Sequence, residues 1–209
     1  MVIGESVGRK KKNIWFDICH IPQYNFYKNL IIRLAKEGHV VYLTVLDRGR
    51  MSLIVQKELA AYPTIKIYII GRHKLTKWSA IIDANLIRIV KLFLWSLDKQ
   101  IDVAYSNAFL SALIGKVKGF YTYTFGDDPL DFKPKMWFSK ISHYCLYELP
   151  SGYTLSSKVK VLPVLKEWAY LAPNVFVPDM KFLDKYKLKP KEYFFVREVS
   201  VGTVNYAGQ

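Results

Sequence analysis

The chain has 209 residues, 51% of them hydrophobic and 23% charged, which is enough apolar content to bury a sizeable core and excludes a disordered or fibrous protein. Its two cysteines form no CxxC pair and give no sign of a secreted disulfide scaffold, so we expect a reducing, cytoplasmic environment. The formal net charge of +14 calls for an anionic partner. Because the basic residues are spread along the chain without a nucleic-acid-binding motif, we expect phosphate-bearing substrates or the anionic inner face of a membrane, and no nucleic acid.

The first predicted segment, residues 1–12, carries a basic cluster but no apolar stretch, so it is interpreted as a flexible basic leader and not as a signal peptide. Residues 13–46 then read as one β-α-β unit. An apolar strand over 14–18 is followed by an amphipathic helix that Gly38 ends, and by a second apolar strand over 40–46. A unit of this length closes as a right-handed crossover between parallel strands.

The same alternation continues through the chain. The expected elements are a helix over 51–61, a strand over 64–70, a helix over 78–97, strands over 102–106 and 120–125 with a helix between them, and a strand over 143–149. Strands that alternate with helices predict an α/β fold, a doubly wound parallel sheet of Rossmann-like type, occupying residues 13–160.

The helix over 78–97 is the most hydrophobic segment. Asp83, Arg88 and Lys91 would lie in the bilayer core if it crossed a membrane, so we expect it to pack on the sheet, with a helix on the membrane surface as the alternative.

Beyond residue 150 the pattern changes to turns and short apolar pieces, then a helix around 180–186, a Lys-Pro breaker and an apolar strand over 193–199. Only ten residues follow that strand. It therefore either joins the first sheet or begins a second one that a longer protein would complete.

Ligands of open parallel sheets bind at the carboxyl ends of the strands, so the turns at these ends supply the candidate site residues. His20, Gln23 and Asn25 follow the first strand. The imidazole of His20 titrates near neutral pH and could act as a base or bind a sugar hydroxyl; the alternative is that it caps the following helix.

Four further candidates follow the fourth and fifth strands. Ser106 and Asn107 could touch a ligand or cap the next helix. Asp127 and Asp128 could supply a general base or hold a sugar hydroxyl, although aspartate before proline is also ordinary turn chemistry.

Two candidates lie late in the chain. Glu167, among aromatic residues, is either an acid of a cleft or the partner of a nearby lysine. Arg197, inside the last predicted strand, needs a phosphate or a structural carboxylate if it is buried.

Several chemistries are set aside. The turn after the first strand has no glycine, so the GxGxxG fingerprint is absent, and no P-loop, GxSxG or HExxH motif occurs. The four histidines show no metal-ligand spacing with the cysteines. We therefore expect neither a cofactor nor a metal.

Two parts of the chain resemble a known family. The motif WFDI-x-x-x-P-x-x-x-FYKNLI-x-x-L-x-x-x-GH near the start, with LKEWAYLAP, VPD and YFFVRE near the end, is similar to an uncharacterised archaeal and bacterial family related to non-hydrolysing UDP-N-acetylglucosamine 2-epimerases and GT-B glycosyltransferases. The resemblance implies two Rossmann-like domains facing a cleft. Residues 161–209 would then be the crossover and the first strand of an incomplete C-terminal domain.

The resemblance also implies a function. It favours sugar transfer from a nucleotide-activated donor to a saccharide or lipid-linked acceptor, with this part of the protein on the acceptor side of the cleft. Gln23 and Asn25 stand where the family tends to have histidines, and Asp128 departs from its Asp-Thr-Glu motif while Asp127 matches. The epimerases resemble one another in an acid after the fourth strand, where this chain has Ser106 and Asn107, which argues against epimerisation. The alternatives are an epimerase-like enzyme and a truncated non-catalytic binding domain, with an unpaired edge strand that favours a homodimer.

Overall fold

The structure is a computed structural model that describes residues 10–73, 86–126, 138–145 and 157–196. The chain divides into two compact units, Met1–Ala172 and Pro173–Gln209. The first unit holds the sheet and its covering helices and is treated first; the second is described by itself afterwards.

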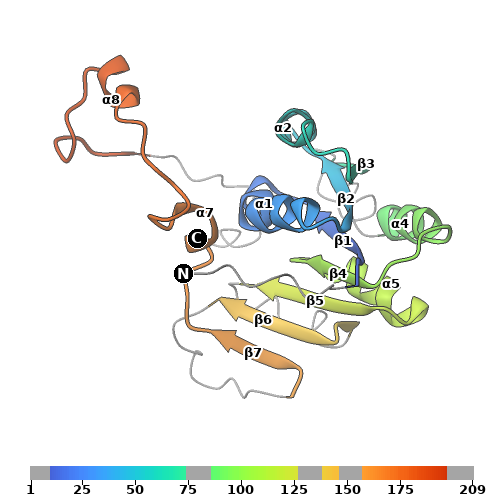
Figure 1. Cartoon of the computed structure of the whole chain (residues 1–209). Helices are drawn as coiled ribbons and strands as arrows, with labels where there is room; N and C mark the ends of the chain where they lie inside the picture. Colours follow the sequence, from blue (N-terminus) through green and yellow to red (C-terminus); the bar gives the residue numbers. More distant parts are fainter. Residues whose placement is uncertain (1–9, 74–85, 127–137, 146–156, 197–209) are drawn as a thin grey trace. The chain divides into compact units, whose positions relative to one another are not determined.

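The first unit is built on one parallel sheet of seven strands in the order β3-β2-β1-β4-β5-β6-β7 (Figure 1). The strands are β1 (Asn13–Ile18), β2 (Val40–Asp47), β3 (Ile65–Arg72), β4 (Val103–Ser106), β5 (Tyr121–Gly126), β6 (Ile141–Cys145) and β7 (Val159–Leu162). The predicted doubly wound parallel sheet is thus confirmed. β6 begins two residues before its predicted start, and residues 146–149 of that prediction lie outside the described ranges.

Strand β7 is the one described strand that the sequence did not predict. Its four residues, VKVL, are too few to show an alternating pattern clearly, and they pair in parallel with β6 from Ser142 to Cys145. The sheet therefore runs past residue 160, where the sequence placed the end of the first domain, and the compact unit itself extends to Ala172.

Helices cover both faces of the sheet. α1 (Ile21–Lys36) and α2 (Met51–Leu59) pack on one face, and α4 (Arg88–Ser96) and α5 (Leu110–Lys118) pack on the other. Successive side chains of β1 point to opposite faces, so Phe16 joins the core under α1 and α2 while Trp15 joins the core under α4 and α5. Of the predicted helix over 78–97, the described part packs on the sheet, and residues 78–85 lie outside the described ranges.

Two glycines set the packing of these helices. Gly38 has φ +84° and follows the end of α1, the left-handed position that the sequence predicted for it. Gly115, in α5, lies so close to β5 that a Cβ there would come within 2.2 Å of the Thr122 methyl group. α5 therefore approaches the sheet more closely than any larger residue at position 115 would allow.

A short helix, α7 (Trp168–Leu171), belongs to the first unit and packs against α1. The Asn29 side-chain amide donates to the Ala169 carbonyl at 2.9 Å. The sequence assigned these residues to the crossover between two domains. In the structure they pack on a helix that covers the first sheet.

The second unit, in its described part, contains α8 (Lys181–Lys185), within the predicted helix. The predicted strand over 193–199 is not formed in residues 193–196, which have no regular secondary structure, and residues 197–199 lie outside the described ranges. Phe194 is 97% exposed. A strand forms only against another backbone, and residues 193–196 pair with no described strand, so apolar composition alone overpredicted this element.

Candidate functional site

The site follows from the strand order, which reverses between β1 and β4. Asp17 near the end of β1 pairs in register with Ser106 at the end of β4, so the turns after these two strands lie side by side. The crevice outside such a reversal is where ligands bind in open α/β sheets. The predicted convergence of these two turns on one edge is confirmed, and Gly126 ends β5 at the same edge. Asp127 and Asp128 lie outside the described residues.

A buried ion pair lies directly beneath this edge. Arg88, at the start of α4, binds the Asp17 carboxylate with both terminal nitrogens, at 3.0 Å and 2.6 Å, and its Nε donates to the Ile70 carbonyl at 3.0 Å. Both side chains are fully buried. Burial by itself lowers the pKa of Arg88, but the neighbouring Asp17 carboxylate outweighs it, so the pKa lies above its ordinary value and the pair is ionised.

Hydrogen bonds extend this pair across the sheet. The Thr44 hydroxyl donates to the Asp17 carboxylate at 2.7 Å and accepts from the Trp15 indole at 2.8 Å. Thr44, Asp17, Ser106 and Thr124 occupy neighbouring strands in one register row, and all four are buried. The carboxyl side of the sheet is therefore fixed by a polar layer and not by apolar packing alone.

Sequence reasoning missed this layer. Arg88 served only as an argument against a membrane span, and Asp17 was not singled out. The signal was present, because an aspartate inside an apolar strand and an arginine inside an apolar helix each need an opposite charge when they are buried.

His20 lies at this edge as the residue before α1, and its side chain makes no capping hydrogen bond. Its imidazole instead lies against Arg48, with Nη1 at 2.6 Å from Nδ1. Although the residue keeps contact with solvent, desolvation by surrounding protein atoms, then Arg48, then His73, lower the pKa of His20 to about 4. The imidazole is therefore neutral at pH 7.

Of the other residues predicted after β1, Gln23 has a structural contact. The Gln23 side-chain carbonyl accepts from the Cys19 backbone N–H at 2.8 Å, which satisfies a donor at the start of α1. Asn25 is half-buried in the second turn of the helix. Burial raises the pKa of Cys19 to about 12, so its thiol is un-ionised at neutral pH and is a poor nucleophile.

After β4, the Ser106 hydroxyl accepts from the Ala108 N–H at 2.9 Å and is buried, which is a local turn contact. Asn107 differs. Its Oδ1 is buried at the end of β4 and has no hydrogen-bond partner among the described residues. A buried carbonyl oxygen without a donor is costly, so this atom is the best-placed described acceptor for a ligand hydroxyl or amide.

The remaining predicted residues do not join this edge in the described chain. Glu167 precedes α7, which packs on α1 at Asn29, well into the helix and away from its start. Arg197 lies outside the described residues. Within the described ranges, no three His, Cys, Asp or Glu side chains gather in a way that could hold a metal ion.

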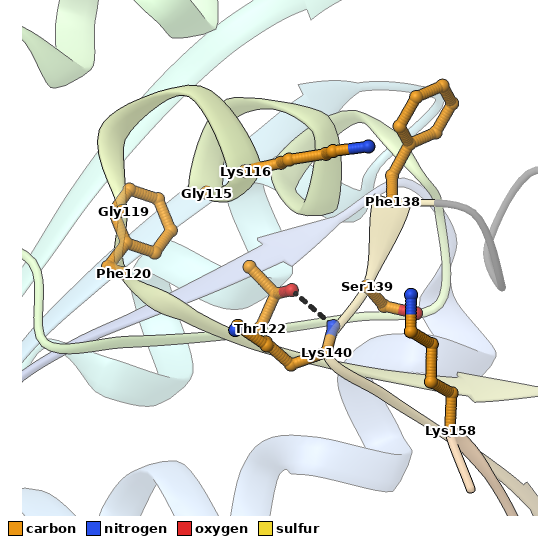
Figure 2. Close-up of a pocket in the computed structure, with 9 residues that line it drawn as sticks. All are labelled: Gly115, Lys116, Gly119, Phe120, Thr122, Phe138, Ser139, Lys140 and Lys158. Atoms are coloured by element: carbon orange, nitrogen blue, oxygen red, sulfur yellow. Dashed lines mark hydrogen bonds between the residues drawn. The ribbon is translucent and has the colours of Figure 1, made fainter.

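Two cavities lie at the opposite, amino edge of the sheet. One, of about 280 Å³, lies between α5 and the starts of β5, β6 and β7, and Figure 2 shows Lys116, Lys140 and Lys158 around it. The other, of about 580 Å³, lies on the α1 face and is lined by Tyr105, Tyr121 and Tyr123 among others. Neither cavity is lined by a candidate residue of the turns after β1 and β4.

The fold is similar to that of a UDP-N-acetylglucosamine 2-epimerase. The enzyme from Rickettsia bellii superposes with a TM-score of 0.58 at 13% identity, over 88% of this chain and 53% of that one. The S. aureus MnaA-UDP co-structure gives 0.54 at 14% identity, over 84% and 51%. MurG of Acinetobacter baumannii gives 0.49 at 15% identity, over 71% and 44%. The chain thus spans about half the length of these structures.

The likeness is one of fold alone at these identities. No family model matches the chain, and no curated protein matches it. The suspected relation to epimerases and GT-B proteins is confirmed at the level of the fold.

Proposed function

We propose that the chain is the N-terminal half of a nucleotide-sugar-dependent glycosyltransferase of GT-B-like architecture, and that the carboxyl edge of its sheet is the acceptor side of the cleft. The observation that carries the proposal is the convergence of the turns after β1 and β4 at the reversal of strand order. This edge presents a cation, Arg48, a donor, the Nε2–H of His20, and an acceptor, the unpartnered Asn107 Oδ1.

In the proposed reaction an acceptor hydroxyl attacks the anomeric carbon of the sugar. A carbon–oxygen bond forms there as the bond to the leaving diphosphate breaks, and the hydroxyl proton passes to a base. Asn107 Oδ1 accepts a hydrogen bond from the hydroxyl. Because His20 Nδ1 accepts from Arg48, the other nitrogen of the neutral imidazole, Nε2, carries its proton and donates to an oxygen of the ligand. With a pKa near 4 His20 takes up the proton less readily than an ordinary histidine, so Asp127 remains the proposed base.

Arg48 has a separate part in the proposal. Its guanidinium is half-buried after β2 and is held against His20. A fixed positive charge of this kind stabilises a phosphate of the acceptor or of the leaving group. The second domain would supply most of the donor contacts.

Epimerisation is the second candidate, because one of the similar structures is a UDP-N-acetylglucosamine 2-epimerase and another is a co-structure with UDP. The described carboxylates near the edge argue against it. Asp17 is held by Arg88, and Asp47 accepts from the Ser52 hydroxyl and pairs with Arg72. Neither is available, in the described part of the chain, to remove a proton from a sugar carbon.

Calorimetry tests the division of labour between the halves. We expect residues 1–209 to bind a UDP-sugar weakly or not at all, and a chain extended by a second Rossmann-like domain to bind it. Tight binding of a UDP-sugar by residues 1–209 alone would refute this division, and failure of both would favour the non-catalytic alternative.

The acceptor side is tested separately by NMR titration of residues 1–209 with saccharide and lipid-linked acceptors. The Asn107 side-chain amide should shift on binding, and Asn107→Ala should weaken binding about tenfold, the effect of one lost hydrogen bond in a desolvated site. Asn174→Ala, at an exposed position of the second unit, is the matched control. Equal affinity of the two variants would remove Asn107 from the site.

A further inference from the structure

The outer side of α4 carries a continuous apolar stripe. Five residues, two of α4 and three that flank its ends, face solvent with exposed fractions of 41–66%, and they follow one another at helical spacing: Leu86, Ile87, Val90, Leu94 and Leu97. The opposite side of the same helix buries Arg88, Leu92 and Ser96 against the sheet. Single exposed leucines are ordinary, but a stripe along the whole visible length of a helix is a surface that binds something apolar.

Lysines flank this stripe. Lys91 lies beside it on α4, and Lys118 comes from α5, which lies next to α4 (Figure 1). Lys118 donates to the Ser96 and Lys99 carbonyls, so the end of α5 is tied to the end of α4. Val117, the residue before Lys118, adds another apolar side chain, which is 67% exposed.

The charge of this face is one-sided. Apart from the buried Arg88, the charged residues of 86–99 and the neighbouring end of α5, residues 117–118, are three lysines and one aspartate, Asp98, which pairs with Lys99. The face therefore combines an apolar centre with a positive surround. α2 shows the contrast, because its exposed Leu53 and Ile54 are neighbours in sequence and form no stripe.

We propose that the α4–α5 face, defined as residues 86–97 with Val117 and Lys118, docks on an anionic lipid bilayer. The leucines and valines enter the boundary between headgroups and acyl chains, and the lysines lie among the anionic headgroups. A second copy of the chain fits this face poorly, since a two-fold contact would bring its lysines against the same lysines of the partner.

The arrangement has a geometric consequence. α4 starts at the carboxyl edge, where Arg88 reaches Asp17, and runs back toward the amino edge. A molecule docked through α4 would hold the turns after β1 and β4 close to the headgroups, within reach of a phosphate-bearing lipid. Docking by this face does not depend on the chemistry carried out at that edge.

Vesicle sedimentation of residues 1–209 tests the proposal. We expect binding to phosphatidylcholine vesicles that contain phosphatidylglycerol, and much less to phosphatidylcholine alone. Binding should weaken with salt, because screening shortens from about 10 Å at 0.1 M to about 3 Å at 1 M ionic strength. Leu94→Asp should lower the partition coefficient about tenfold, and Lys91→Glu about fivefold or more.

Matched controls lie on the other face of the sheet. Leu53→Asp and Lys57→Glu, exposed on α2, should bind as the unsubstituted chain does. Circular dichroism and thermal melting show whether each variant is folded. If Leu94→Asp does not fold, the surface variant Lys91→Glu still tests the proposal.

Three outcomes would overturn the proposal. One is equal sedimentation with neutral and anionic vesicles. Another is loss of binding on changing the exposed Phe194 and Phe195 to serine while Leu94→Asp binds normally. The third is a dimer, seen by light scattering, that Leu94→Asp dissociates, since that result assigns the stripe to a second copy.

Discussion

The two faces of the sheet are built differently. Under α1 and α2 the core is a cluster of apolar and aromatic side chains, among them Phe16, Ile31 and Leu43. Under α4 and α5 an apolar cluster around Trp15 lies beside the buried polar row of the strands. Asp17 belongs to this row, and Arg88 of α4 binds it. The first face supplies burial, and the second fixes the geometry of the carboxyl edge through directional bonds.

The difference teaches where the molecule is vulnerable. Apolar contacts are many and weak, so the loss of one is shared among its neighbours. A buried charge has few partners, and removal of one leaves the other without compensation. Substitutions on the two faces should therefore differ in size and in whether a second substitution rescues them.

The largest effect is expected for Arg88→Met. It removes the guanidinium and leaves the Asp17 carboxylate buried with Thr44 as its described donor, so the free energy of unfolding should fall by about 4 kcal/mol. Urea denaturation measures it. The double variant Asp17→Leu with Arg88→Met should recover most of the loss. A cost under about 1 kcal/mol for Arg88→Met alone would contradict a buried, ionised pair.

On the apolar face, Leu43→Ala should cost about 3 kcal/mol, the transfer of the lost carbons plus the cavity they leave. Leu92→Ala, equally buried under α4, is the matched variant and should cost about the same. If Leu92→Ala exceeds Arg88→Met, the second face is held by packing and the contrast between the faces fails.

A smaller effect is expected for Thr44→Val, which keeps the shape of the side chain but removes its hydroxyl. Trp15 then loses its acceptor and Asp17 one of its donors, and stability should fall by about 2 kcal/mol. Combined with the Asp17→Leu and Arg88→Met pair, the same change should cost less, because the two sites share Asp17. Strict additivity would argue against one connected network.

The smallest effect concerns pH. Because the pKa of His20 is lowered to about 4, the unfolded chain binds more protons than the folded one between about pH 4 and pH 6.5, and stability falls as the pH falls through that range. Arg48→Gln removes one cause of the lowering and should raise this pKa, so the fall becomes shallower. NMR titration of the imidazole measures the shift. Arg50→Gln, an exposed arginine two residues away, is the control and should leave it unchanged.

Much of the fold could be predicted from the sequence, because a local pattern of apolar and polar residues indicates each of β1 to β5 and α1, α2 and α5. The carboxyl ends of β1 and β4, which meet at the reversal of strand order, were predicted as the site because ligands of open parallel sheets bind at the carboxyl ends of the strands. The link between Asp17 and Arg88 could not be predicted, since it joins residues 71 positions apart and pairing over such a distance has no local signature. His20 was predicted as a site residue, but its partner Arg48 was not, for the same reason.

In the second unit a local pattern led to a wrong prediction. Residues 193–196 have the composition of a buried strand, yet they form none in the described chain. Strand propensity reports how well side chains suit a pleated, half-buried surface, and it cannot supply the neighbouring backbone. A strand predicted from composition is most reliable where a nearby segment of the sequence also predicts the strand that pairs with it.

The central position of β1 also bears on how the protein is made. Its first residue, Asn13, donates its backbone N–H to the Asp102 carboxylate, 89 residues later, whereas β2 follows directly after α1. During synthesis β1, β2 and β3 can therefore pair while one side of β1 still waits for β4 to leave the ribosome. Until then the edge of a largely apolar strand is open in the middle of the future sheet, and closing it requires a long-range contact that forms slowly. A chaperone that shields this edge should raise the yield of folded protein more than one that acts after residue 126 has emerged.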